Sequence, residues 1–90
     1  MRVRGDSMAP TLIDGDDILV DRVDGDARMR DGIYVLQRDE ALLVKRLALS
    51  PATGKLTISS DNPAYPSWND CDVADVRILG RVVWTGRRLG

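Results

Sequence analysis

The sequence has 90 residues, of which 43% are hydrophobic, and this size allows one domain with one modest core. Its formal net charge of −1 does not provide the broad positive surface that grips a nucleic-acid backbone. Histidine is absent, which excludes a Ser-His-Asp triad, a Cys-His dyad and the usual histidine-containing zinc sites.

Short runs of alternating apolar and polar residues predict five strands, over residues 16–22, 32–38, 41–50, 55–61 and 76–89. Turn residues separate these runs and predict a loop over 21–31, a tight connection over 38–41, a turn over 51–54 and an irregular segment over 62–72. Gly80 interrupts the last strand and predicts a β-bulge there. Since no segment has a helical period beyond one turn, we expect a mostly β fold with a compact, barrel-like sheet.

The stretch GDSMAPTL (residues 5–12) places Ser7 in a turn between a glycine and a proline. Gly5 permits unusual backbone angles and Pro10 restricts the exit path, so the turn could expose the hydroxyl and leave neighbouring amides free as an oxyanion hole. A serine in such a turn is more often structural than catalytic. A serine hydroxyl also needs a base, and without histidine the base must be Lys, Asp or Glu.

The chain has two lysines, Lys45 and Lys55. Lys55 follows a turn and is expected to be exposed. Lys45 lies in mid-strand, where alternation puts it on one face with Leu43, Leu47 and Leu49. Burial there would lower its pKa and make it a neutral amine able to accept the serine proton. The alternative is a lysine whose stem covers apolar surface while its amine reaches water. Considered together with Ser7, a Ser-Lys dyad is the better interpretation.

Other polar residues suggest no further chemistry. The acidic stretches IDGDD (residues 13–17) and DGD (residues 24–26) lack calcium-loop spacing and are interpreted as turns. Cys71 has no base partner and permits no internal disulfide, which favours a reducing compartment. Trp84 is expected in the core or in an interface. No signal peptide and no apolar run of membrane-spanning length are visible, so we expect a cytoplasmic protein with no metal and no cofactor.

Six motifs occur in one order along the chain: GDSMAPTL (5–12), DGDDILVD (14–21), DGIYVL (31–36), LLVKRL (42–47), SDNPAYP (60–66) and ILGRVVW (78–84). With these motifs the chain resembles the serine peptidase domain of LexA-type repressors, a group that includes phage repressors and UmuD-like proteins. The resemblance implies that Ser7 is the nucleophile and Lys45 the general base. It also implies an oxyanion hole formed by backbone amides near Asp6 and Ser7.

The resemblance further implies that residues 1–90 form a LexA-like peptidase and dimerisation domain. In that family the domain cuts a linker in its own upstream chain, follows a helix-turn-helix DNA-binding domain and forms a homodimer. Neither the helix-turn-helix nor the Ala-Gly or Cys-Gly bond often cut in the family occurs in these residues. We therefore expect both to lie in an upstream segment. Stimulation of the cut by a RecA-type filament is a further implication.

Two alternatives remain open. The fold could serve as a repressor dimerisation module with an idle dyad, because sequence does not distinguish a working dyad from an idle one. Signal peptidases share a similar serine motif and a Ser-Lys dyad, but they carry membrane anchors and a larger body. An encoded helix-turn-helix upstream would favour the repressor, and an encoded transmembrane helix would favour the signal peptidase.

Overall fold

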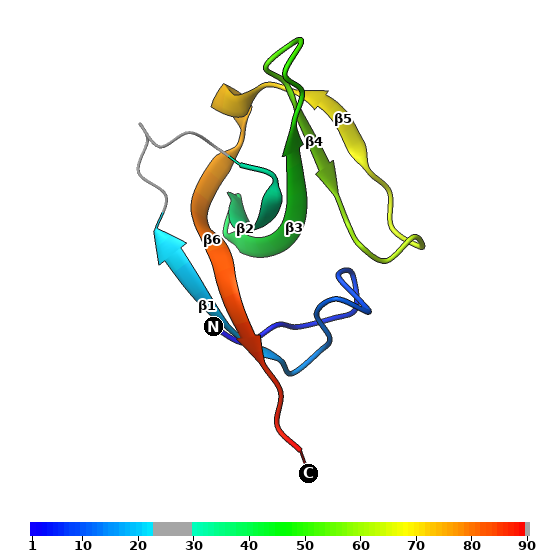
Figure 1. Cartoon of the computed structure of the whole chain (residues 1–90), viewed down its shortest axis with the longest axis vertical. Coiled ribbons are helices and arrows are strands. Elements are labelled where there is room, and N and C mark those ends of the chain that lie inside the picture. Colours follow the sequence, from blue (N-terminus) through cyan, green and yellow to red (C-terminus); the bar gives the residue numbers. More distant parts are fainter. Residues whose placement is uncertain (23–29, 90) are drawn as a thin grey trace.

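The computed structural model describes residues 1–22 and 30–89 and contains six strands (Figure 1). The strands are β1 (Asp17–Arg22), β2 (Gly32–Arg38), β3 (Ala41–Leu49), β4 (Leu56–Ser59), β5 (Trp68–Cys71) and β6 (Arg77–Gly86). One short 3-10 helix, η1 (Val73–Asp75), precedes β6. Within the described residues, no helix is long and apolar enough to cross a membrane. The expected mostly β fold is confirmed.

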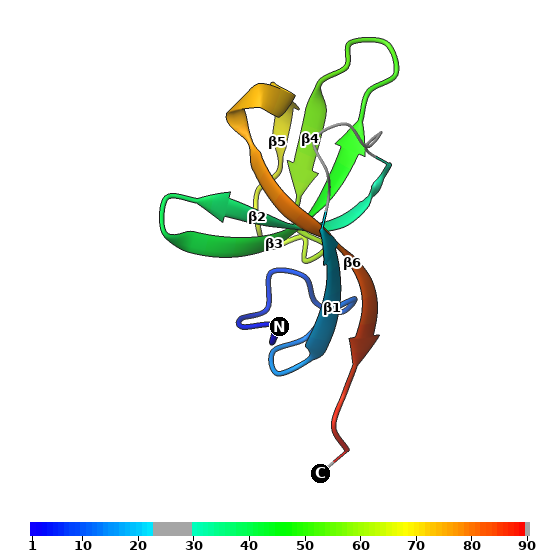
Figure 2. The same cartoon turned by 90° about the vertical axis from the view of Figure 1, so that its left-hand side faces the viewer.

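All six strands form a single antiparallel sheet in the order β1-β6-β2-β3-β4-β5. Strands β1 and β5 lie at its two edges, so the sheet is open and fits the expected barrel only loosely. Figure 2 shows β6 as a long curved strand, with the β2–β3 hairpin projecting to one side of it. The N-terminal segment lies beside this hairpin, and this arrangement brings the Ser7 turn close to β3.

The five predicted strands are present with small changes at their ends. β2 has the predicted bounds, and β1 and β3 differ from the prediction by one residue. The tight connection is confirmed, with Asp39 at φ 54°, a left-handed conformation that aspartate tolerates in hairpin turns. β4 ends two residues early, at Ser59, and β6 ends three residues early, at Gly86. Residues 23–29 of the predicted loop lie outside the described residues.

The prediction of an irregular segment over 62–72 is wrong at its end, because β5 forms there. Ile58 of β4 pairs with Trp68, and Leu56 pairs with Cys71. The sequence Trp-Asn-Asp-Cys contains no β-branched residue and two poor strand formers, so local propensity did not indicate a strand. The pairing depends instead on the free edge that β4 offers to a segment folding back along it.

The bulge predicted at Gly80 lies next to it. Gly80 pairs with Val35 and Ile78 pairs with Leu36, so the register skips one residue of β6 between them. Gly80 itself serves close packing, because an added Cβ would lie 2.4 Å from Val20 Cγ1 and 2.5 Å from the Asp21 carbonyl oxygen. Only glycine allows β1 and β6 to approach this closely.

The core consists of two clusters on opposite faces of the sheet, and their buried residues are aliphatic apart from Met8 and Tyr34. One cluster joins the N-terminal segment to β1 and β2, and its buried members are Val3, Met8, Leu12, Ile18 and Val35. The other lies between β2, β3 and β4, and its buried members are Tyr34, Leu36, Leu47 and Ile58. The Ser7 turn is thus held by one cluster, while the face that carries Lys45 belongs to the other.

Candidate active site

The segment that carries Ser7 folds back before β1. The Val3 amide donates to the Asp16 carbonyl oxygen at 2.8 Å, which closes the segment into a loop. Gly5 has φ 81°, a conformation that favours glycine, as the sequence analysis predicted. Met8 is only 1% exposed and anchors the turn in the core, whereas the adjacent Ser7 is half-buried. The turn therefore directs one residue inward and leaves the serine hydroxyl accessible.

Lys45 lies in the middle of β3 and is 8% exposed. Leu43 and Leu47 pack in the cluster on the same face of the sheet, so the predicted apolar row is confirmed at these positions. Lys45 Nζ donates a hydrogen bond of 2.7 Å to Ser60 Oγ. Burial lowers the pKa of Lys45 below its usual value because desolvation disfavours the ammonium. The alternative of an amine in open water does not fit this environment.

Two aromatic rings lie close to the Lys45 amine. Nζ lies 5.8 Å from the centre of the Tyr65 ring and 5.9 Å from that of the Trp68 ring. Such ring faces favour the charged amine, whereas burial opposes it, and burial determines the direction of the pKa shift. Tyr65 and Trp68 are 41% and 40% exposed, so both residues remain in contact with solvent.

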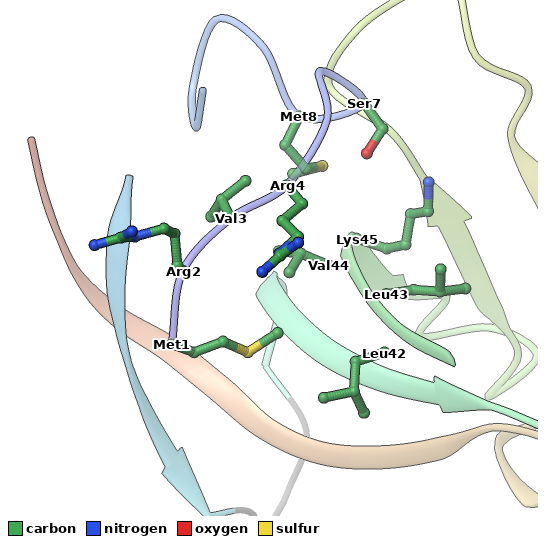
Figure 3. A pocket seen from close by; sticks show the side chains of 10 residues that line it. All are labelled: Met1, Arg2, Val3, Arg4, Ser7, Met8, Leu42, Leu43, Val44 and Lys45. Atoms are coloured by element: carbon green, nitrogen blue, oxygen red, sulfur yellow. The ribbon is translucent and has the colours of Figure 1, made fainter. Parts of the chain in front are cut away.

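Ser7 and Lys45 meet at one cavity of about 310 Å³. The cavity is lined by the N-terminal segment on one side and by residues 42–45 of β3 on the other. In Figure 3 the Ser7 hydroxyl and the Lys45 amine point toward one another across it. Two residues separated by 38 positions in the sequence thus face one space, which is the arrangement that a nucleophile and its base require.

Sequence reasoning assigned no role to three residues around Lys45: Ser60, Tyr65 and Trp68. Ser60 and Tyr65 belong to the motif SDNPAYP, which supported the resemblance but carried no chemistry of its own. This motif could have indicated a role at the site, because a polar segment at a fixed position in a family's sequence pattern often contributes residues to the active site. Trp68 had no such signal, since its position depends on β5.

Two acidic residues of the stretch 13–17 have structural partners. Asp14 accepts a hydrogen bond from the Gly5 amide, and Asp16 accepts from the Ile13 amide. Both fit the predicted turn, while Asp24 and Asp26 lie outside the described residues. No three metal-ligating side chains come together among the residues described. Trp84 is 54% exposed, so its expected place in the core is wrong and the interface alternative remains.

Comparison with known proteins gives the family. The model of the Peptidase S24-like family matches residues 1–83. The chain belongs to this family. Two curated proteins are also similar to this S24-like chain: the repressor protein CI of Enterobacteria phage phi80, 38% identical over 81 residues, and the 26 kDa repressor protein of Escherichia phage HK022, 39% identical over 83 residues. The matches cover 89% and 90% of the S24-like chain but only 33% and 34% of the relatives, so the chain spans about a third of their length.

Proposed function

We propose that this S24-like chain is the C-terminal domain of a repressor-type transcription regulator that cuts a linker in its own upstream chain. The family match and the repressor names of two relatives support the first part of this proposal. The observation that carries the second part is the buried Lys45 amine facing the Ser7 hydroxyl across one cavity (Figure 3).

The proposed reaction begins with Lys45 as a neutral amine. Nζ takes the proton of Ser7 Oγ while Oγ bonds to the carbonyl carbon of the scissile peptide. The resulting ammonium returns its proton to the departing amine, which leaves an ester on Ser7. Water, activated by the same amine, then hydrolyses that ester. The lowered pKa of Lys45 supports this role because it increases the neutral fraction near physiological pH.

The negative oxygen formed during the attack needs hydrogen-bond donors. We propose the backbone amides of Asp6 and Ser7 for this task. In support, neither amide donates a hydrogen bond to another group among the described residues, although the carbonyls of the same two residues are engaged by Asn62. Free amides beside an exposed nucleophile are the donors that such a reaction uses.

The proposed substrate is a linker upstream of residue 1 in the complete gene product, preceded by a DNA-binding domain. The two relatives are about three times as long as the matched region, which leaves room for both parts. A tethered linker reaches the site at high effective concentration, whereas a free peptide must bind without that advantage. Stimulation by a RecA-type filament stays a prediction.

The test uses the full gene product incubated over a pH series. The parental protein should be cut once, at a rate that rises with pH and then levels off. Ser7→Ala and Lys45→Arg should both stop the cut, since one lacks the nucleophile and the other cannot accept a proton. Lys55→Arg is the matched control, because the Lys55 side chain is 44% exposed and pairs with Asp72 on the surface. A folded Lys45→Arg protein that still cuts at the parental rate would contradict the dyad.

A second function, dimerisation, is supported by the apolar surface at the β1 edge. Leu19 and Trp84 lie opposite each other on paired strands and are 59% and 54% exposed, and the nearby Val83 is 47% exposed. We propose that a second copy of the chain covers this surface. If neither the parental full protein nor any variant is cut, the interpretation as a dimerisation module with an idle dyad would remain.

A further inference from the structure

The carboxylate of Asp61 joins the two elements that carry Ser7 and Lys45. Arg46 donates to it from Nε at 2.7 Å and from Nη2 at 2.8 Å, and Thr11 Oγ1 donates at 2.6 Å. Arg46 directly follows Lys45 on β3, and Thr11 lies four residues after Ser7. The Asp61 side chain is only 13% exposed, so water competes little for these bonds.

The neighbours of Asp61 hold the same two elements. Ser60 Oγ accepts the hydrogen bond from Lys45 Nζ. On the other side, Asn62 donates its amide to the Ser7 carbonyl oxygen at 3.0 Å and its side chain to the Asp6 carbonyl oxygen at 3.0 Å. Three consecutive residues, 60–62, thus contact the base, the strand behind it and the nucleophile turn.

Ser60 and Asp61 bind side chains on opposite faces of β3. Lys45 and Arg46 are adjacent in a strand, so they point to opposite faces of the sheet. Ser60 binds the first and Asp61 binds the second, which fixes the chain on both faces of β3. The Asp61 amide also lies 3.5 Å from Met8 Sδ, next to Ser7. A displacement of Asp61 would therefore move the nucleophile turn relative to the base.

We propose that Asp61 is the positioning residue of the Ser7–Lys45 dyad, holding the nucleophile turn against the strand that carries the base. This inference rests on the proposed peptidase function. It assigns Asp61 no contact with the substrate and no proton transfer. Its effect is on geometry alone, which matters because a displacement of about 1 Å can reduce a catalysed rate by ~100-fold.

The charge of Asp61 is constant over the pH range in which the amine would titrate. The hydrogen bonds from Arg46 hold the pKa of Asp61 below its usual range, against the opposing effect of burial, and the bond from Thr11 acts in the same direction as Arg46. Other charged or titratable groups around the Lys45 amine are Arg2 and Arg4, which line the same cavity, and Tyr65, whose ring lies beside the amine and whose hydroxyl donates to Asp6. Burial, and not the charge of Asp61, causes the pKa shift of Lys45, so loss of Asp61 should lower the maximal rate and leave the midpoint of the pH profile in place.

The experiment measures the reaction of Ser7 with a fluorophosphonate in the full gene product, from pH 6 to pH 11. In this reaction Ser7 Oγ bonds to phosphorus, fluoride leaves and the serine proton passes to Lys45. The probe needs no bound linker, so it reports the dyad itself. Asp61→Asn should lower the plateau rate by about tenfold or more at an unchanged midpoint. Thr11→Val, which removes one hydroxyl at equal size, should lower it less.

Asp72→Asn is the matched control, because Asp72 is also paired with a basic side chain but is 61% exposed. Melting curves accompany each variant, and Thr11→Val keeps the test valid where Asp61→Asn does not fold. A folded Asp61→Asn protein labelled at the parental plateau would overturn the proposal. A shifted midpoint at an equal plateau would also overturn it, since Asp61 would then act through charge. If Ser7 of the parental protein is not labelled at any pH, the proposed peptidase function and this inference both fail.

Discussion

Replacing Lys45 with methionine should remove activity and change how stability depends on pH. Lys45→Met keeps an unbranched apolar side chain of similar length but lacks the amine. Because burial lowers the pKa of Lys45 in the folded state, the unfolded chain binds more protons between the folded pKa and the unfolded value of about 10.4. The parental protein is therefore destabilised by its charged amine at low pH and regains that stability as the pH rises through this window.

The difference in stability between Lys45→Met and the parental protein follows from two opposing contributions. Each unit by which burial lowers the pKa costs the folded protein about 1.4 kcal/mol while the amine is charged. The methionine variant avoids this cost but loses the 2.7 Å hydrogen bond to Ser60, which contributes about 1 kcal/mol. Ser60 is half-buried and can bind water instead, so the second contribution is the smaller one. Lys45→Met should thus be at least as stable as the parental protein at pH 7 and lose that advantage by pH 11.

Thermal unfolding of both proteins at pH 7 and pH 11 measures this difference. A change of 1 kcal/mol corresponds to roughly 4–8 °C in Tm for a domain of this size. Lys55→Met is the control, because it makes the same change at a lysine whose side chain is 44% exposed. An equal stability difference between the Lys45→Met and parental proteins at both pH values would refute the reasoning. Lys45 would then be solvated in the folded state, and burial would not increase its neutral fraction.

Three further outcomes are expected. Trp84→Arg should convert a dimer into a monomer in sedimentation at micromolar concentration, because it places a charge on the exposed apolar surface; a parental protein that is monomeric at high micromolar concentration would contradict the proposed interface. Gly80→Ala should lower the free energy of unfolding by about 1–3 kcal/mol or more, since the added Cβ would clash with Val20 Cγ1. A chemical denaturation curve with the parental midpoint would show that β1 and β6 can move apart at no cost in stability. The hydrogen bonds from Arg87 lower the pKa of Asp16, so Asp16→Asn should destabilise the protein at pH 7. The difference in stability from the parental protein should shrink as the pH falls below about 4. An unchanged Tm at pH 7 would argue against a stabilising Asp16–Arg87 pair.

The position of Asp16 explains why its pair with Arg87 is of interest. Asp16 is fully buried before β1, and Arg87 lies just after β6, so the pair joins the two strands at the end of the ribbon where Asp17 pairs with Gly86. The same residue accepts the Ile13 amide and its carbonyl accepts the Val3 amide. Asp16 thus holds Arg87 with its carboxylate and the N-terminal segment that carries Ser7 with its backbone carbonyl oxygen.

Much of the fold could be predicted from local pattern. Alternation along β1, β2 and β3 placed these strands to within one residue, because each strand buries side chains with a period of two. The absence of histidine, together with a lysine in a leucine row, also selected Ser7 and Lys45 as the candidate pair before any contact was known. The strand predictions succeeded because they depend on residue type and on spacing within one element, whereas the assignment of Ser7 and Lys45 as a catalytic pair stays a prediction.

The tertiary structure decided what depends on distant contacts. β5 exists because β4 offers it an edge, so its own residues carry little strand signal. The aromatic neighbours of the Lys45 amine, Tyr65 and Trp68, lie at least 20 residues away in the sequence. The hydrogen bonds of Asp61 to Arg46 and Thr11 likewise join segments separated by 15 and 50 positions. Side chains so far apart meet only after the chain has closed long loops, and no local propensity encodes which of them will face one another.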